Sequence, residues 1–450
     1  MFCYLCIMQI QLSDHFDYSR LLRFTLPSIA MMVFTSIYSV VDGYFVSNYA
    51  GKLPLAAVNM AWPVIMMLAS LGMMFGTGGS ALIAAAQGRG RKQRANEYFS
   101  LIVYVVIALG FVLAGATWFL MEPLMKLLGA EGGLLADGVF YGKVCLVGLP
   151  AFMMQMLFQS LFITAEKPQL GFYVTVGAGV ANMVLDWVLI GVLGMGLFGA
   201  ALATDFGFLV GGVIPLFYFS RKNSSTLHLG RACWKPHALL KASFNGCSEM
   251  LSGIASSVVT LLYNYQLLRY AGENGVAAFS VIMYVTFIFF ALLIGYCNGV
   301  APVISYHFGA RNQVELKNLF KRCMVIMGVS GVGLLALAQL LAFPLSGIFV
   351  GYDEALCDMT VKAFRIVCFC FMLSGFNIFA SSLFTALNNG FVSAVISTSR
   401  SIVFEAACVL LLPLLFGING IWFAIWGTEM ATFALAAFFV IRKRKVYGYL

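Results

Sequence analysis

Charged side chains are scarce in this 450-residue sequence. Asp, Glu, Lys and Arg together make up 10% of it, whereas hydrophobic residues make up 61%. Soluble proteins average about 25% charged and about 45 to 50% apolar residues. So little charge could not cover so much apolar surface in water, which excludes a soluble globular protein. The net charge of +9 does not indicate nucleic acid, because the basic residues lie in short stretches between apolar runs.

The sequence also has few of the residues that an enzyme or a metal cofactor would require. It contains four histidines, none deep within an apolar run, and no GxxxxGK[ST] stretch for ATP phosphates. Its 11 cysteines are mostly single residues in apolar runs, apart from one CxxC at Cys3 and Cys6 and one CxC at Cys368 and Cys370. We therefore expect no enzyme activity and no cofactor.

Long apolar runs dominate the remaining sequence, and each could cross a hydrocarbon core about 30 Å thick as a helix. Twelve such runs are found, at residues 21–47, 55–86, 96–120, 138–164, 170–192, 197–219, 245–270, 276–307, 316–342, 361–387, 391–416 and 419–441. The sequence therefore predicts an all-α membrane protein with 12 transmembrane helices. With the N-terminus in the cytoplasm, 20 of the 27 basic residues fall on the cytoplasmic side, so we expect both termini there.

The two halves of the chain are similar to each other. YAGKLPLAA, from Tyr49, matches YAGENGVAA, from Tyr270, and the offset of 221 residues continues without a gap from Gly78 onto Gly299. Six helices per half is an even number, which predicts two parallel lobes related by a pseudo-twofold axis along the membrane normal. We expect an N-terminal extension at 1–13, with translation starting at Met8. The expected N-lobe is 14–220, the cytoplasmic linker 221–244, the C-lobe 245–441 and the basic tail 442–450.

We select two ionisable residues within the apolar runs of the first half as candidate site residues. Asp42 and Asp186 lie at similar depth near the outer ends of their helices, together with Asn182 and Thr204. Because two like charges at one depth in low dielectric require a cation, these four residues predict a site for a proton or Na⁺. The alternative interpretation is that each carboxylate only bonds a neighbouring helix for packing.

The second half carries different polar residues in its apolar runs. Asn264 and Gln266 are candidates for lining a cavity, since such groups must face protein or water. The ionisable candidates of this half are Glu249, Arg400, Glu405 and Glu429. We expect Arg400 to pair with Glu249, either as a structural ion pair or in transport.

Three stretches together resemble the multidrug and toxic compound extrusion (MATE) family, and its bacterial MepA-type branch in particular. They are VDGYFV at 41–46, NMVLDWVLI at 182–190 and GVAPVISYHFGARN at 299–312. The resemblance implies a secondary transporter of the bacterial cytoplasmic (inner) membrane, without a cofactor. It would export organic cations, drugs or other amphipathic compounds by alternating access, in exchange for H⁺ or Na⁺.

The resemblance also implies roles for individual residues. Asp42, Asn182, Asp186 and Thr204 would couple cation entry to substrate release, with a bend of the first helix at Pro27. A polar helix-four position of the family falls on Gln159, which cannot titrate. We expect a monomer in the bilayer. The alternative is a flippase or exporter of lipid-linked saccharides or metabolites, although a pyrophosphate substrate would call for a cavity rich in Arg and Lys.

Overall fold

The computed structural model describes residues 10–46, 49, 52–351 and 353–450, and the start expected at Met8 lies outside them. In the first half, the helices are α1 (Tyr18–Phe45), α2 (Lys52–Gly88), α3 (Lys92–Leu127), α4 (Gly132–Thr164), α5 (Pro168–Asp186), the π-helical turn η3 (Trp187–Val192) and α6 (Gly196–Ser220). The second half contains α7 (Pro236–Gly309), α8 (Gln313–Val350), α9 (Glu354–Val367), the 3₁₀ turn η4 (Cys368–Cys370), α10 (Phe371–Ala386), α11 (Gly390–Thr398), the π-helical turn η5 (Ser399–Phe404), α12 (Glu405–Phe416) and α13 (Ile418–Tyr447).

Within the described residues, twelve helices cross the bundle, as predicted. Among the described residues, eleven helical segments are long and apolar enough to span a membrane. The twelfth crossing is the first part of α7, which breaks sharply at Gly272 (φ 63°, ψ −153°). Only glycine adopts this backbone conformation readily, so Gly272 reverses the chain without a longer loop. Three other crossings consist of an α-helix interrupted or extended by η3, η4 or η5.

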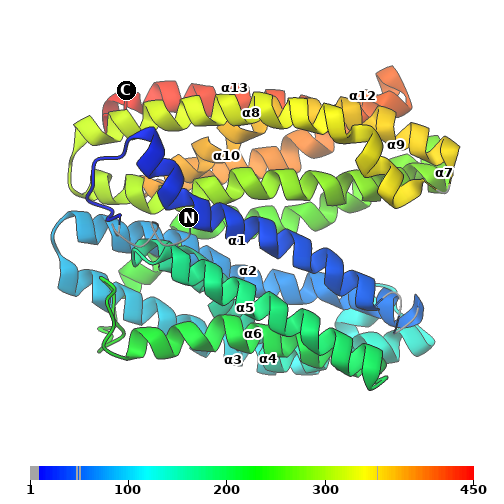
Figure 1. Ribbon diagram of the computed structural model, residues 1–450, viewed down its shortest axis with the longest axis horizontal. Coiled ribbons are helices and arrows are strands. Elements are labelled where there is room, and N and C mark those ends of the chain that lie inside the picture. Colours follow the sequence, from blue (N-terminus) through cyan, green and yellow to red (C-terminus); the bar gives the residue numbers. More distant parts are fainter. Residues whose placement is uncertain (1–9, 47–48, 50–51, 352) are drawn as a thin grey trace, which may run out of the picture.

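The two halves form two layers (Figure 1). Helices α2 to α6 lie in one layer and α8 to α13 lie in the other, and α1 runs obliquely between the two layers. The start of α1 and the end of α13 lie at the same end of the bundle, which we call the inner end after the topology expected from the charges. The opposite end is called the outer end.

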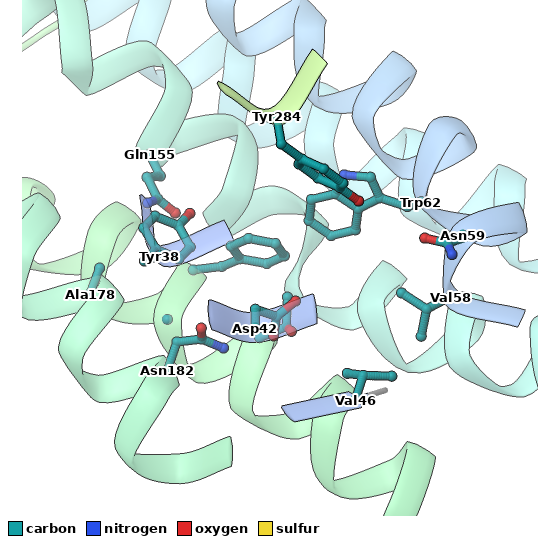
Figure 2. Close-up of a pocket in the computed structure, with 13 residues that line it drawn as sticks. Tyr38, Asp42, Val46, Val58, Asn59, Trp62, Gln155, Ala178, Asn182 and Tyr284 are labelled. Atoms are coloured by element: carbon teal, nitrogen blue, oxygen red, sulfur yellow. The ribbon is translucent and has the colours of Figure 1, made fainter. Parts of the chain in front are cut away.

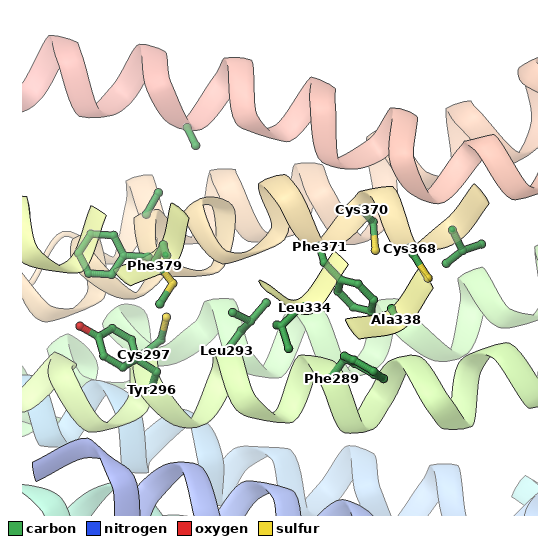
Figure 3. Packing of buried hydrophobic residues seen from close by; sticks show 14 of the residues in the cluster. Phe289, Leu293, Tyr296, Cys297, Leu334, Ala338, Cys368, Cys370, Phe371 and Phe379 are labelled. Carbon is green, nitrogen blue, oxygen red and sulfur yellow. The ribbon is translucent and has the colours of Figure 1, made fainter. Parts of the chain in front are cut away.

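Each half has its own hydrophobic core. Phe152, Phe158 and Phe219 are fully buried or nearly so in the first half. In the second half, Phe289 of α7 stacks on Phe371 of α10 (Figure 3). Their ring centroids are 5.2 Å apart. Separate cores allow the halves to move relative to each other without disrupting the packing within either one.

Glycines bring α2 and α7 into backbone contact between the two halves. A Cβ at Gly78 would lie 2.0 Å from the carbonyl oxygen of Ala242, and one at Gly246 would lie 1.9 Å from that of Met74. Towards the ends of the same helices, a Cβ at Gly88 would lie 2.0 Å from the carbonyl oxygen of Tyr306. Small residues of this kind let helices approach closely in membranes. The two halves are therefore closed against each other at the inner end.

Candidate functional site: a cavity beside two carboxylates

A cavity of about 170 Å³ lies between helices α1, α2, α4, α5 and α6 of the first half, with one wall from α7 of the second. Figure 2 shows side chains from these helices pointing into it. The lining residues are Tyr38, Asp42, Val46, Val58, Asn59, Trp62, Gln155, Ala178, Asn182, Thr204, Gly207, Phe208 and Tyr284. The cavity therefore combines aromatic rings with one carboxylate, three amides and hydroxyl groups.

Asp42 lines this cavity and lies beside Asp186, although 144 positions separate the two in the sequence. Asp186 itself is not among the lining residues. Asp42 also interacts with Asn182, which precedes Asp186 by one helical turn of α5. Both carboxylate oxygens of Asp186 are buried, and no donor among the described residues forms a well-aligned hydrogen bond to them. Two adjacent buried carboxylates repel unless a proton or a metal cation shares the site. The pair is therefore suited to binding a cation.

Aromatic side chains form one wall of the cavity. Trp62 of α2 stacks on Phe208 of α6 at a centroid distance of 6.4 Å, and Phe208 stacks on Phe152 of α4 at 4.0 Å. Tyr38 of α1 and Tyr284 of α7 add two more rings. Aromatic faces attract organic cations, most strongly where water is excluded. These rings and the Asp42 carboxylate line the same cavity.

The structure places the two other N-lobe candidates differently. Thr204 lines the cavity on α6 and interacts with the buried Tyr141 of α4. Gln159 is absent from the lining, although its amide nitrogen is buried without a hydrogen-bond partner among the described residues. Gln155, one helical turn earlier on α4, occupies the cavity instead and packs against Gly211.

The cavity candidates of the second half lie elsewhere. Asn264 lines a neighbouring cavity of about 380 Å³, and Tyr284 borders both cavities. Gln266 is 5% exposed and donates a hydrogen bond of 3.3 Å to the carbonyl oxygen of Val409, so it joins α7 to α12. Glu249 lines a small cavity between the halves, together with Thr77, Ser80, Ser160 and Asn298 among others.

The expected pairing of Arg400 with Glu249 is wrong. Arg400 donates from Nε (2.9 Å) and Nη2 (2.5 Å) to the same carboxylate oxygen of Glu429, and Asn377 donates to the other oxygen at 2.6 Å. The π-helical turn η5, which contains Arg400, aims this side chain at α13. Glu405, one turn further along, lies in the electrostatic field of Arg400 and Glu429. These residues form an ionic cluster within the second half.

A third acidic residue was missed in the first half. Asp205, on α6, is 7% exposed and interacts with the backbone N–H of Gly148 on α4. A Cβ at Gly148 would lie only 2.2 Å from Oδ1 of Asp205, so the carboxylate packs directly on the glycine. The criterion that selected Asp42 and Asp186, an acid within an apolar run, applies equally to Asp205. The aromatic residues of the cavity could not be identified from the sequence in this way, because aromatic rings in membrane proteins also face lipid.

Pro27 lies at the point where α1 passes from one half to the other. On its inner side, a Cβ at Gly299 of α7 would lie 2.8 Å from the side chain of Thr25. On its outer side, a Cβ at Gly179 of α5 would lie 2.6 Å from the ring of Phe34. Helix α1 thus contacts the second half both before Pro27 and just after it, where Ser28 and Ile29 lie against Gly295 of α7, and it contacts the first half further along. Proline removes one backbone hydrogen bond from a helix interior, which favours bending there.

Comparisons with known proteins agree with this architecture. The MatE family profile matches the chain twice, at residues 27–188 and 250–410. The chain is 24% identical to the multidrug export protein MepA of Staphylococcus saprophyticus over 410 residues, which cover 90% of this chain and 88% of the relative. It is 23% identical to MepA of Staphylococcus aureus (strain NCTC 8325) over 428 residues, which cover 94% and 93% of the two chains.

Solved structures share the same fold. One, described as the outward-facing conformation of a multidrug resistance MATE family transporter of the MOP superfamily, aligns with a TM-score of 0.91 at 21% identity, over 97% of this chain and 98% of that one. A crystal structure of MATE in the bent conformation aligns with a TM-score of 0.88 at 21% identity, over 96% and 97%.

Proposed function

We propose that this chain, which belongs to the MatE family, is a cation-coupled antiporter that exports organic cations and related amphipathic compounds. The observation that carries the proposal is the adjacency of Asp42 and Asp186 beside a cavity with an aromatic wall. The names of the MepA relatives support multidrug compounds as the substrate class. The membrane is the bacterial cytoplasmic membrane, with both chain ends in the cytoplasm.

The proposed mechanism is competition for one region of negative charge. An organic cation binds with its charge near Asp42 and its rings against Trp62 and Tyr284. Entry of H⁺ or Na⁺ between Asp42 and Asp186 then cancels one of the two negative charges, so the electrostatic attraction for the substrate weakens and the substrate leaves. Asn182 and Thr204 supply further oxygens around the ion. Within the part of the chain that the structure describes, no Arg or Lys lines the cavity, which disfavours a flippase for pyrophosphate-linked substrates.

The proposed conformational step is a bend of α1 at Pro27. Because α1 contacts the second half around Pro27 and the first half further along, a change of charge at Asp42 can alter how the two halves meet. The substitution Pro27→Ala restores the missing backbone donor. It should slow export while leaving substrate binding in place. A normal export rate for this variant would exclude the bend.

Export from vesicles tests the coupling site. Purified protein is reconstituted, a fluorescent organic cation is loaded, and Na⁺ and pH gradients are imposed separately. We expect at least a tenfold loss of gradient-driven export in Asp42→Asn and in Asp186→Asn, with the matched change Asp358→Asn, at an exposed position, behaving as wild type. Unchanged export in both variants would remove the coupling role from this pair.

A further inference from the structure

A second hollow, of about 330 Å³, lies at the inner end, where the turn between α2 and α3 meets the start of α7. Its polar rim is largely basic, and its floor is apolar. The lining residues are Leu82, Ala85, Ala86, Arg89, Arg91, Arg94, Tyr98, Lys235, His237, Ala238, Lys241 and Asn388. We call it the basic hollow. It is separate from the cavity beside Asp42, and the two share no lining residue.

The positive charge of the basic hollow is largely uncompensated. Lys235 forms an ion pair with Glu97. Among the described residues, no carboxylate pairs with the other four cations of the hollow, Arg89, Arg91, Arg94 and Lys241. Partial burial and the neighbouring charge of Arg89 lower the pKa of Lys241. Holding like charges together costs free energy, which an anion in the hollow would recover.

Two helices begin at this hollow and add to its positive potential. Helix α3 follows Arg91 and helix α7 follows Lys235, and neither of these N-cap positions has a side-chain hydrogen bond to the free backbone donors. The N-terminal end of a helix carries a partial positive charge that favours anions. The potential of the backbone therefore has the same sign as that of the side chains.

The concentration of charge is more than the usual excess of basic residues in cytoplasmic loops. At the 221-residue offset, Arg89, Arg91 and Arg94 correspond to Ala310, Asn312 and Glu315, so the equivalent turn of the second half has no basic residue at these three positions. The duplicated fold therefore does not require these three arginines. A ligand for them provides a reason for their grouping.

We infer that the basic hollow binds a phosphate group with at least one negative charge, carried by an anionic phospholipid headgroup or by a soluble phosphate compound. Arginine presents a planar set of donors that matches phosphate oxygens in bidentate pairs. Basic pockets between transmembrane helices on the cytoplasmic side bind anionic lipid headgroups in this way. The apolar floor, formed by Leu82, Ala85 and Ala238, suits the first carbons of a lipid attached to that phosphate.

A ligand in the basic hollow would connect the two halves. Arg89 and Arg94 belong to the first half, whereas Lys241 and Asn388 belong to the second. Asn388 also donates a hydrogen bond of 3.4 Å to the carbonyl oxygen of Ala81 on α2. A bound phosphate therefore stabilises the conformation in which the inner end is closed, relative to an inward-open conformation.

Thermal unfolding of the full chain in a neutral detergent tests the inference. The midpoint is measured with added phosphatidylglycerol, with phosphatidylcholine and with inorganic pyrophosphate. The triple variant Arg91→Ala, Arg94→Ala, Lys241→Ala removes charge from the hollow. Its matched control is Lys317→Ala, Lys321→Ala, Lys445→Ala, which removes the same charge from exposed positions of the second half.

The expected result is a rise of about 2 °C or more in wild type and in the control, and a much smaller rise in the triple variant. A rise with phosphatidylglycerol alone identifies a lipid headgroup, and a rise with pyrophosphate identifies a soluble phosphate compound. Equal responses of wild type and the triple variant, or an equal loss in the control, would overturn the inference. If the triple variant does not fold, the single variant Arg94→Gln is measured in its place, and the same outcomes support or overturn the inference.

Discussion

The guanidinium of Arg400 and the carboxylate of Glu429 form an ion pair inside the second half, with both hydrogen bonds directed to one oxygen. The side chain of Glu429 is 4% exposed and that of Arg400 is 25% exposed. The buried carboxylate of Glu429 is therefore stabilised in its charged form by Arg400 and by the hydrogen bond from Asn377. The second half thus uses its buried acid internally, whereas Asp42 and Asp186 of the first half lie together without a basic partner among the described residues.

This relationship predicts the effect of removing the acid. Glu429→Gln leaves the Arg400 charge partly buried and unpaired, which should lower the free energy of unfolding by up to about 3 kcal/mol. The measurement is the unfolding midpoint in detergent. The change Glu131→Gln, at an exposed position, serves as control and should have little effect. An unchanged midpoint for Glu429→Gln would show that the ion pair adds no stability.

The contact between Asp205 and Gly148 predicts a steric effect. In Gly148→Ala the new Cβ would lie 2.2 Å from Oδ1 of Asp205, so α4 and α6 must separate or the carboxylate must leave its donor. We expect a loss of roughly 1 to 3 kcal/mol. Gly177→Ala is the matched control, because its Cβ meets nothing within 4 Å, and it should stabilise α5 slightly. Equal unfolding midpoints for the two variants would contradict this account.

Close packing of α2 on α7 predicts a change in the conformational equilibrium. In Gly246→Ala the Cβ would lie 1.9 Å from the carbonyl oxygen of Met74, which should separate the halves at the inner end. Spin labels on Gln93→Cys and Lys317→Cys, in a background without other cysteines, report this as a longer interlabel distance. Gly115→Ala, with nothing within 4 Å of its Cβ, should leave the distance distribution unchanged. The same distribution in both glycine variants would rule out the predicted separation.

The segment before α1 contacts both halves, so we expect it to stabilise the folded protein. The backbone N–H of Leu12 donates to Glu166 of the first half at 2.8 Å, and that of Phe16 donates to Glu315 of the second half at 2.9 Å. Phe16 is fully buried, and its ring meets that of Phe24 at 5.7 Å.

Phe16→Ala should therefore lower the free energy of unfolding by about 3 to 5 kcal/mol. The unfolding midpoint is again the measurement. The exposed aromatic change Trp234→Ala is the control and should have little effect, since Trp234 is 74% exposed. Similar midpoints for both variants would show that the segment is not part of the folded core.

The architecture could be predicted from sequence because it depends on local properties. Each crossing needs about 20 apolar residues, and the basic residues between crossings indicate which loops share a side. The duplication was readable from residue identities at a constant offset. Asp42 and Asp186 could also be found, since a charge within an apolar run is exceptional wherever the helices pack.

The partners of these residues were decided only by the tertiary structure. In a membrane, apolar residues face both lipid and protein, so sequence periodicity does not tell which side of a helix meets which neighbour. Trp62, Tyr284 and Gln155 therefore gave no signal as cavity residues. Arg400 was assigned to the wrong acid because the turn of η5 that directs it to Glu429 depends on how α12 and α13 pack. Local sequence thus determined which residues cross the membrane and which are charged, whereas long-range packing determined which of them meet.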